Sequence, residues 1–184
     1  MNRDSALQLL KKYIQNDQLI KHSLATEAIM RKLAVELDED PERWGMIGLL
    51  HDLDFDQTKD NPEKHTVIAA KLLTDNGFDQ NFIDAVQSHN AEELGLERKT
   101  TVEFALTAAE SITGLIVATT LVYPEKKIAA VKSKSIRKRM KAKAFARAVS
   151  RERILECEQL GVEFPRFVEI SLTAMGEISD ELGL

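Results

Sequence analysis

The stretch from Gly45 to Asp56 reads GMIGLLHDLDFD, and it carries both a fold signal and the first candidate metal ligands. An uncharged run leads directly into His51 and Asp52. Neighbouring residues inside a regular helix point about 100° apart, so their side chains rarely reach one point. Where a helix ends, the backbone can turn and the two side chains can converge. We therefore expect a buried helix that ends at this pair, with a carboxylate able to bridge two metal ions.

Helical periodicity extends from this stretch in both directions. Apolar residues recur three and four positions apart, and no segment alternates as a half-buried strand would. Upstream, helices are expected over about 5–15 and 19–37, and Pro41 fits the first turn of the helix leading to His51. Downstream, we expect a loop after Asp52 and then a helix from Asn61-Pro62 to Gly77. A further helix is capped by Asp79, and another covers about 101–121 and is stopped by Pro124. Gly161 and Pro165 separate the last two helices. The pattern predicts one all-α domain over residues 1–184.

Composition supports a soluble globular protein of one domain. The 184 residues are 43% hydrophobic and 30% charged, which is ordinary for such proteins. The single cysteine, Cys157, excludes an internal disulfide and suits a reducing compartment. The N-terminus lacks the pattern of a secretion signal, and the run 104–124 is too polar for a membrane span. We expect a cytoplasmic protein with no membrane partner.

The four histidines of the chain and one isolated acid are the candidate metal ligands: His22, His51, His65, His89 and Glu110. Imidazoles and carboxylates bind first-row metals where thiolates are absent. Taken singly, each histidine could instead be a hydrogen-bonded core residue, and His89 could interact with a helix C-terminus. Because no histidine is used elsewhere, a shared metal site is the favoured interpretation.

Glu110 is the only charged side chain between Phe104 and Pro124. Burying an unpaired carboxylate costs several kcal/mol or forces it to become neutral, and a metal ion would remove that penalty. The alternative is a partly exposed glutamate, or one satisfied by hydroxyls such as those of Thr107 and Ser111.

Three segments resemble the HD superfamily of metal-dependent phosphohydrolases: KHSLATEAIMRKLA around His22, GMIGLLHDLDFD around the His-Asp pair, and TAAESITGL around Glu110. The resemblance covers about residues 19–120 and leaves 121–184 as a helical extension. It implies that His22, His51, Asp52 and Glu110 hold a first metal and that His65 and His89 serve a second. Nitrogen and oxygen ligands without sulfur suit Mn, Fe, Co, Ni or Zn, at one or two ions per chain.

Two departures from the family pattern stand out. The late acid is usually Asp, and Glu110 carries one more methylene, which could shift the second metal site or weaken an enzyme. The lysine that some relatives carry shortly after the pair is not evident, and Asp54 or Asp56 is expected to orient a ligand or a water instead.

The resemblance implies hydrolysis of a nucleotide or another small phosphate ester by a water that a metal ion activates. Asp52 would be a ligand, and His65 or His89 would bind a second ion or steer the substrate and protonate the leaving oxygen. The alternative is a catalytically weakened HD-type module with a structural or regulatory role. Glu110 favours that alternative, whereas four histidines favour an enzyme, because a structural site needs only four ligands.

The segment 126–153 holds 12 of the 25 basic residues and one acid, Glu152. It could contribute phosphate contacts or be a solvated helix face, which is the favoured interpretation. Its buried stripe is expected to consist of Ile136, Met140, Ala144 and Ala148, with Lys134, Arg137, Lys138, Lys141 and Arg147 pointing away. Nucleic acid is not an expected partner, since Phe145 is the only aromatic residue in the segment. An oligomer is left open, although Trp44 is expected to pack internally.

Overall fold

The computed structural model describes residues 1–184 and contains helices but no strands. The α-helices are α1 (Arg3–Tyr13), α2 (Asp17–Glu36), α3 (Pro41–Leu50), α4 (Phe55–Thr58), α5 (Val67–Asp75), α6 (Gln80–Ser88), α7 (Ala91–Leu94), α8 (Thr101–Leu121), α9 (Ser133–Met140), α10 (Arg151–Leu155), α11 (Phe164–Glu177) and α12 (Ser179–Leu182). Three short 3-10 helices are η1 (Pro62–Lys64), η2 (Ile128–Ala130) and η3 (Glu156–Leu160). The predicted all-α fold class is confirmed.

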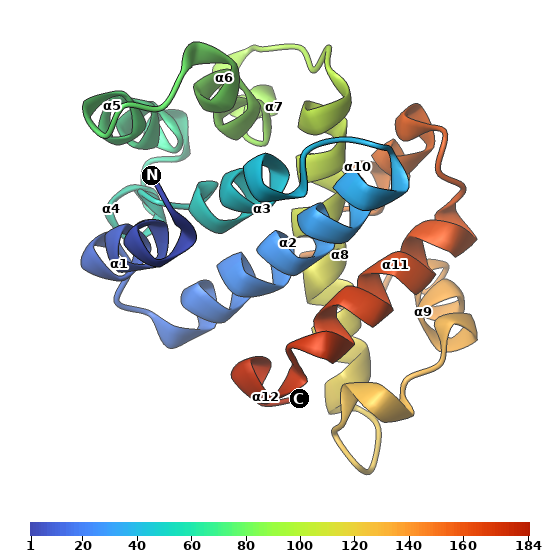
Figure 1. Ribbon diagram of the computed structural model, residues 1–184. Coiled ribbons are helices and arrows are strands. Elements are labelled where there is room, and N and C mark those ends of the chain that lie inside the picture. Colours follow the sequence, from blue (N-terminus) through green and yellow to red (C-terminus); the bar gives the residue numbers. More distant parts are fainter.

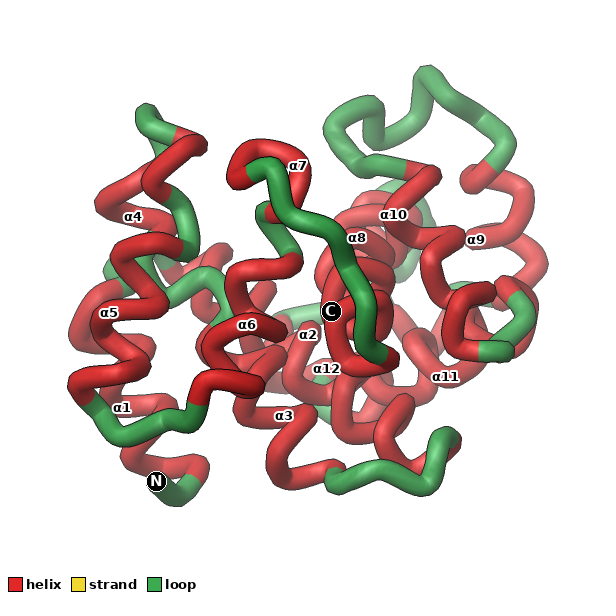
Figure 2. Tube along the Cα trace, turned by 90° about the horizontal axis from the view of Figure 1, so that it is seen from above, coloured by secondary structure: helices red, strands yellow, loops and turns green.

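Helices α2 and α8 form the centre of the molecule. Helix α8 crosses behind α2, and α11 lies beside α2 (Figure 1). Helices α4 and α5 lie on one side and α9 and α10 on the other, with α6, α7 and α8 between them (Figure 2). One continuous cluster of buried apolar residues extends from Ala6 in α1 to Leu182 in α12. Helices before and after residue 120 therefore share a single core, to which Trp44 belongs.

The close packing of α2 against α3 brings the candidate metal ligands on α2 close to those that follow the end of α3. Gly48 of α3 faces the backbone of Glu27 in α2, and a Cβ at this glycine would lie 3.0 Å from both the Glu27 nitrogen and its Cα. The Glu27 carboxylate is buried and accepts hydrogen bonds from Arg3 Nε at 2.6 Å and Arg31 Nε at 3.1 Å. These contacts hold α1, α2 and α3 in a fixed register.

Several expected helices are confirmed, with their caps. The helix over 101–121 has the predicted bounds, and Pro41 lies in the first turn of α3. Asp79 caps α6 by accepting a hydrogen bond from the Phe82 backbone N–H. The expectation that the run 104–124 is too polar for a membrane span is wrong by composition, because α8 is long and apolar enough to cross a membrane. However, 67% of its most apolar window is buried inside the protein, as expected for a core helix.

The segment after Asp52 differs from the prediction of a loop followed by one continuous helix. It contains α4 and η1, and the expected helix from Pro62 is interrupted before α5. The interruption falls at Thr66, whose φ of +70° lies in the left-handed region. It leaves His65 at the end of η1 rather than inside a helix.

The predicted buried stripe of the basic segment is half wrong. Ile136 and Met140 are buried on α9, but the helix ends at Met140, and Ala144 and Ala148 are exposed in turns. Arg151 stabilises these turns: its guanidinium donates 2.6 Å hydrogen bonds to the carbonyls of Ala146 and Val149 and also contacts the carbonyl of Phe145. These bonds satisfy backbone carbonyls outside a helix. The basic side chains named for this segment are exposed, as predicted.

We predict that Gly48→Ala lowers the free energy of unfolding by about 1–3 kcal/mol, because the added methyl group overpacks the contact between α2 and α3. Chemical denaturation measures the change. The matched control is Gly176→Ala in α11, where nothing lies within 4 Å of the added Cβ. The control should be neutral or stabilising by up to about 1 kcal/mol. Equal stability of the two variants would contradict the role assigned to Gly48.

Candidate metal centre

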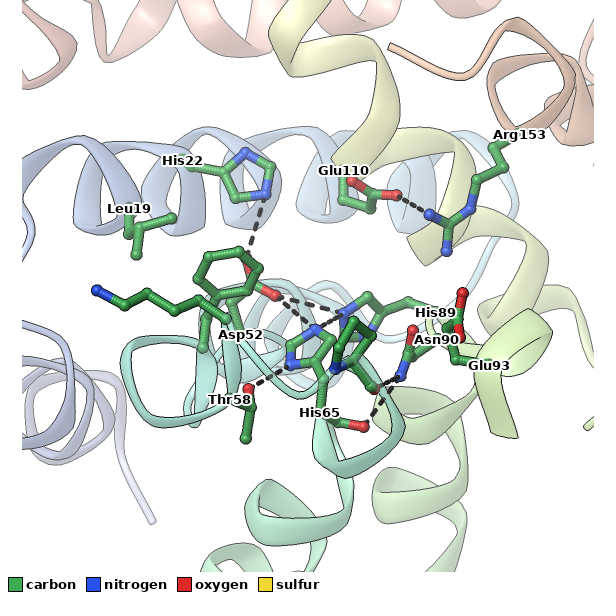
Figure 3. Close-up of a pocket in the computed structure, with 13 residues that line it drawn as sticks. Leu19, His22, Asp52, Thr58, His65, His89, Asn90, Glu93, Glu110 and Arg153 are labelled. Carbon is green, nitrogen blue, oxygen red and sulfur yellow. Dashed lines mark hydrogen bonds and ion pairs between the residues drawn. The ribbon is translucent and has the colours of Figure 1, made fainter. Parts of the chain in front are cut away.

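Four histidines and one aspartate from distant segments meet in one place. Figure 3 shows Asp52 with three of these histidines, His22, His65 and His89. His22 lies on α2, His51 and Asp52 follow the end of α3, His65 follows η1, and His89 follows the end of α6. Two groups have ligand atoms that all lie within 4.8 Å of one another: His22, His51 and Asp52, and Asp52, His65 and His89.

Asp52 is the only member of both groups, and each of its oxygens faces one pair of histidines. Oδ2 lies 3.7 Å from His22 Nε2 and 3.5 Å from His51 Nε2. Oδ1 lies 3.2 Å from His65 Nε2 and 3.3 Å from His89 Nε2. This is the arrangement of a carboxylate that can bridge two cations.

The ends of α3 and α6 fix two of the imidazole rings in the same way. His51 Nδ1 lies 2.8 Å from the Gly48 carbonyl, and His89 Nδ1 lies 2.6 Å from the Val86 carbonyl. The last carbonyls of a helix lack partners inside the helix. A carbonyl only accepts hydrogen bonds, so Nδ1 carries the proton on each ring and Nε2 presents its lone pair to the cluster.

His22 is oriented by Thr113 of α8. The Thr113 hydroxyl donates to the Glu110 carbonyl at 2.6 Å, so it accepts from His22 Nδ1, which lies 3.0 Å away. His22 Nε2 is then directed at His51 Nε2, at a distance of 3.1 Å. Two unprotonated nitrogens at this distance repel each other unless a proton or a cation lies between them.

Asp54 performs the orienting role expected for it, whereas Asp56 does not. The buried Asp54 carboxylate accepts from His65 Nδ1 and from the Ala69 backbone N–H, each at 2.8 Å. The Asp56 carboxylate instead accepts from the backbone N–H of Gln15 at 2.7 Å, a contact outside the cluster. Histidine ligands of metals commonly donate their second N–H to such a carboxylate.

The protonation states within the cluster follow from burial and charge. Burial lowers the pKa of His51 to about 3, so its imidazole is neutral at pH 7. Burial favours the neutral acid at Asp52, yet the surrounding histidines together hold the pKa of this carboxyl well below its usual range. Burial opposes the charge of His65, but Asp52 and Asp54 raise its pKa to about 9. A metal ion can replace the extra proton on His65.

Glu110 lines the same cavity but belongs to neither group of converging ligand atoms. Its Oε1 accepts a hydrogen bond from Ser111 Oγ at 2.7 Å and lies 3.5 Å from Arg153 Nη1. The hydroxyl contact foreseen in the alternative interpretation is therefore present for Ser111, whereas Thr107 donates to the Glu103 carbonyl. That Glu110 is a metal ligand stays a prediction.

The cluster opens into a polar cavity of about 530 Å³. Besides the candidate ligands it is lined by two basic side chains, Lys59 and Arg153. Neither Lys59 nor Arg153 was predicted from the sequence to be a residue of the site. Lys59 lies seven positions after Asp52, beyond the short α4 that was expected to be loop. Arg153 is the last residue of the basic segment, and α10 brings it to the cavity.

A family model for the HD domain matches residues 19–120, which is more than half of the chain. The chain belongs to the HD domain family. The matched range agrees with the segment expected from the sequence, and it includes all four histidines, Asp52 and Glu110. No solved structure gives a significant match.

The residues present fit the divalent metal ions that HD domains bind. The observation that decides the fit is the convergence of imidazole Nε2 atoms in two close pairs, 3.1 Å apart for His22 and His51 and 2.9 Å apart for His65 and His89. Each pair faces an oxygen of Asp52. A cation would relieve the repulsion between the lone pairs of His22 and His51, take the place of the extra proton on His65 and neutralise the buried carboxylate.

We predict that Asp54→Asn weakens metal binding roughly 10- to 100-fold, because His65 loses the carboxylate that fixes its ring and raises its basicity. Isothermal titration of the chelator-treated protein with Mn²⁺ measures the affinity. Asp56→Asn is the matched control, since it removes a carboxylate of the same loop that bonds only to the Gln15 backbone N–H. If the two variants bind Mn²⁺ equally well, the orienting role of Asp54 is wrong.

Proposed function

We propose that this HD domain protein is a metal-dependent phosphohydrolase that acts on a nucleotide or another small phosphate ester. The observation that carries the proposal is the Asp52 carboxylate, which presents one oxygen to each of two histidine pairs at the base of an open polar cavity. Membership of a family whose members are generally hydrolases supports the reaction class. The cavity volume of about 530 Å³ suits a small-molecule substrate.

One ion would be held by His22, His51 and Asp52, and a second by Asp52, His65 and His89. Nitrogen and oxygen donors suit Mn, Fe, Co, Ni or Zn. A bound ion supplies Lewis acidity, which neutralises phosphoryl charge and lowers the pKa of water.

The chain's own residues contribute position and charge. Gly48, Val86 and Thr113 hold three of the imidazole rings through Nδ1, so that the Nε2 atoms of these rings are directed inward without reorganisation. Asp54 holds the ring of His65 in the same way. His65 and His89 both direct Nε2 at Asp52, which favours the ligand role over proton transfer to the leaving oxygen.

The remaining basic segment does not favour a nucleic-acid partner. Its exposed lysines and arginines lie before α9, on α9 and in the turns after it, and of the segment only Arg153 lines the metal-site cavity. We also propose a cytoplasmic location, which agrees with the free, buried Cys157.

A catalytically weakened module is the second candidate, and the position of Glu110 outside both ligand groups is the observation that favours it. The two candidates predict the same metal content but different turnover. A metal-loaded protein that hydrolyses no phosphate ester would support the weakened module.

We predict that wild-type protein reconstituted with Mn²⁺ binds one or two equivalents and hydrolyses p-nitrophenyl phosphate or a nucleotide in a broad screen of esters. Asp52→Asn should lose both the metal and the hydrolysis, because it removes the charge shared by the two groups. Metal analysis and product release measure the two quantities. Glu110→Gln tests the predicted ligand role of Glu110: loss of metal in this variant would show that Glu110 is a ligand, and full metal content would show that it is not. Full metal content in Asp52→Asn would contradict the proposed site.

A further inference from the structure

We propose that Arg153 binds the phosphoryl group of the substrate, so that the C-terminal extension forms part of the active site. This inference rests on the proposed function and identifies the residue that recognises the anionic group. Arg153 lies on α10, outside the residues matched by the HD domain model.

The position of Arg153 is set by α10 and its cap. Helix α10 packs against α8, which carries Glu110. Ser150 caps α10 by accepting from the Arg153 backbone N–H at 3.3 Å. The side chain lines the same cavity as His22, Asp52, His65 and His89. Figure 3 shows Arg153 and Glu110 facing each other on the side of the cavity opposite His65 and Thr58.

The guanidinium of Arg153 is held only loosely. Its Nη1 lies 3.5 Å from Glu110 Oε1 and its Nη2 lies 3.5 Å from Glu92 Oε2, and neither contact is a hydrogen bond. Its Nε is buried and has no hydrogen-bond partner. The buried Nε of Arg98 and of Arg151 also lacks a partner, so the distinguishing feature of Arg153 is its two Nη groups, which donate no hydrogen bond to the protein and retain capacity to donate.

Both acids beside Arg153 already have closer partners. Glu92 accepts from the two Nη atoms of Arg98 at 2.8 and 2.9 Å, and Glu110 accepts from Ser111 Oγ at 2.7 Å. Arginines that serve only to join helices in this protein are bound much more tightly. Arg43, for example, donates to both oxygens of Asp79 at 2.7 and 2.6 Å. Arg153 therefore differs from Arg43 because its Nη groups make only 3.5 Å contacts with carboxylates and no hydrogen bond.

A phosphoryl group matches the donors that Arg153 leaves unused. The planar guanidinium binds phosphate oxygens through two parallel N–H groups. The cavity wall around it is otherwise acidic, with Glu93 and Glu110 among the lining residues. Without Arg153, these carboxylates would repel a phosphate approaching the cluster from this side. Lys59, exposed and without an ion pair, lines the cavity as its other basic residue.

The test is the affinity of the Mn²⁺-reconstituted protein for inorganic phosphate, measured by isothermal titration calorimetry. Arg153→Gln should weaken phosphate binding roughly 10- to 100-fold, as expected for loss of hydrogen bonds to a charged group. Arg153→Lys should also weaken it, to a smaller degree, because an ammonium keeps the charge but not the fork. Arg147→Gln, which removes an exposed arginine of the same basic segment, should bind phosphate like the wild type.

A purely structural role would give a different pattern. In that case Arg153→Gln would lower the melting temperature and leave phosphate affinity unchanged, and this result would overturn the proposal. Arg153→Lys keeps a positive charge between Glu92 and Glu110, so this variant should stay folded even if Arg153→Gln does not. Phosphate affinity of Arg153→Lys equal to that of the wild type would also overturn the proposal.

Failure of this inference is distinguishable from failure of the proposed function. Unchanged phosphate affinity in both Arg153 variants, with ester hydrolysis intact in the wild type, rejects only the role of Arg153. Weakened phosphate affinity in the variants of a protein that hydrolyses no ester supports the binding site and rejects the enzyme.

Discussion

The carboxylate of Asp52 is the constraint on which the rest of the site depends. It is almost completely buried and remains ionised, so it requires positive charge on both of its oxygens. The two histidine pairs around it offer nitrogen lone pairs, and the one extra positive charge is the proton on His65. That proton lies beside Oδ1 of Asp52, whereas Oδ2 faces His22 and His51. Divalent cations would satisfy the carboxylate and the imidazole lone pairs together.

The C-terminal ends of α3 and α6 position two of the candidate metal ligands. His51 and His89 each follow the last residue of a helix and donate Nδ1–H to the carbonyl three residues earlier. The same hydrogen bond thus completes the helix terminus and fixes the tautomer needed for metal binding. The close contact of α2 and α3 at Gly48 then sets the spacing between His22 and His51. Fold stability and ligand geometry are coupled at these points.

The sequence predicted much of this arrangement because the strongest signals were local. Pro41, the uncharged run before His51 and the apolar run before Pro124 determine α3 and α8 through short-range rules. The convergence of the four histidines was predicted because the chain has no others.

The remaining features depend on contacts between distant residues. Nothing local to Glu110 indicates that Arg153 lies beside it. The turns after Met140 are stabilised by Arg151, which satisfies carbonyls that a helix would otherwise use. The break at Thr66 directly follows His65, whose two ring nitrogens contact Asp52 and Asp54. The helical spacing of apolar residues carries no information about these contacts, so it could not predict the break.

The most direct measurement is anomalous X-ray diffraction from crystals of the protein soaked with Mn²⁺. We expect an anomalous peak bounded by Nε2 of His22, Nε2 of His51 and the Asp52 carboxylate. At full occupancy we expect a second peak between Asp52, His65 and His89. A peak ligated through Nδ1 atoms, or a manganese ion that does not touch Asp52, would contradict the proposed bridging role of Asp52.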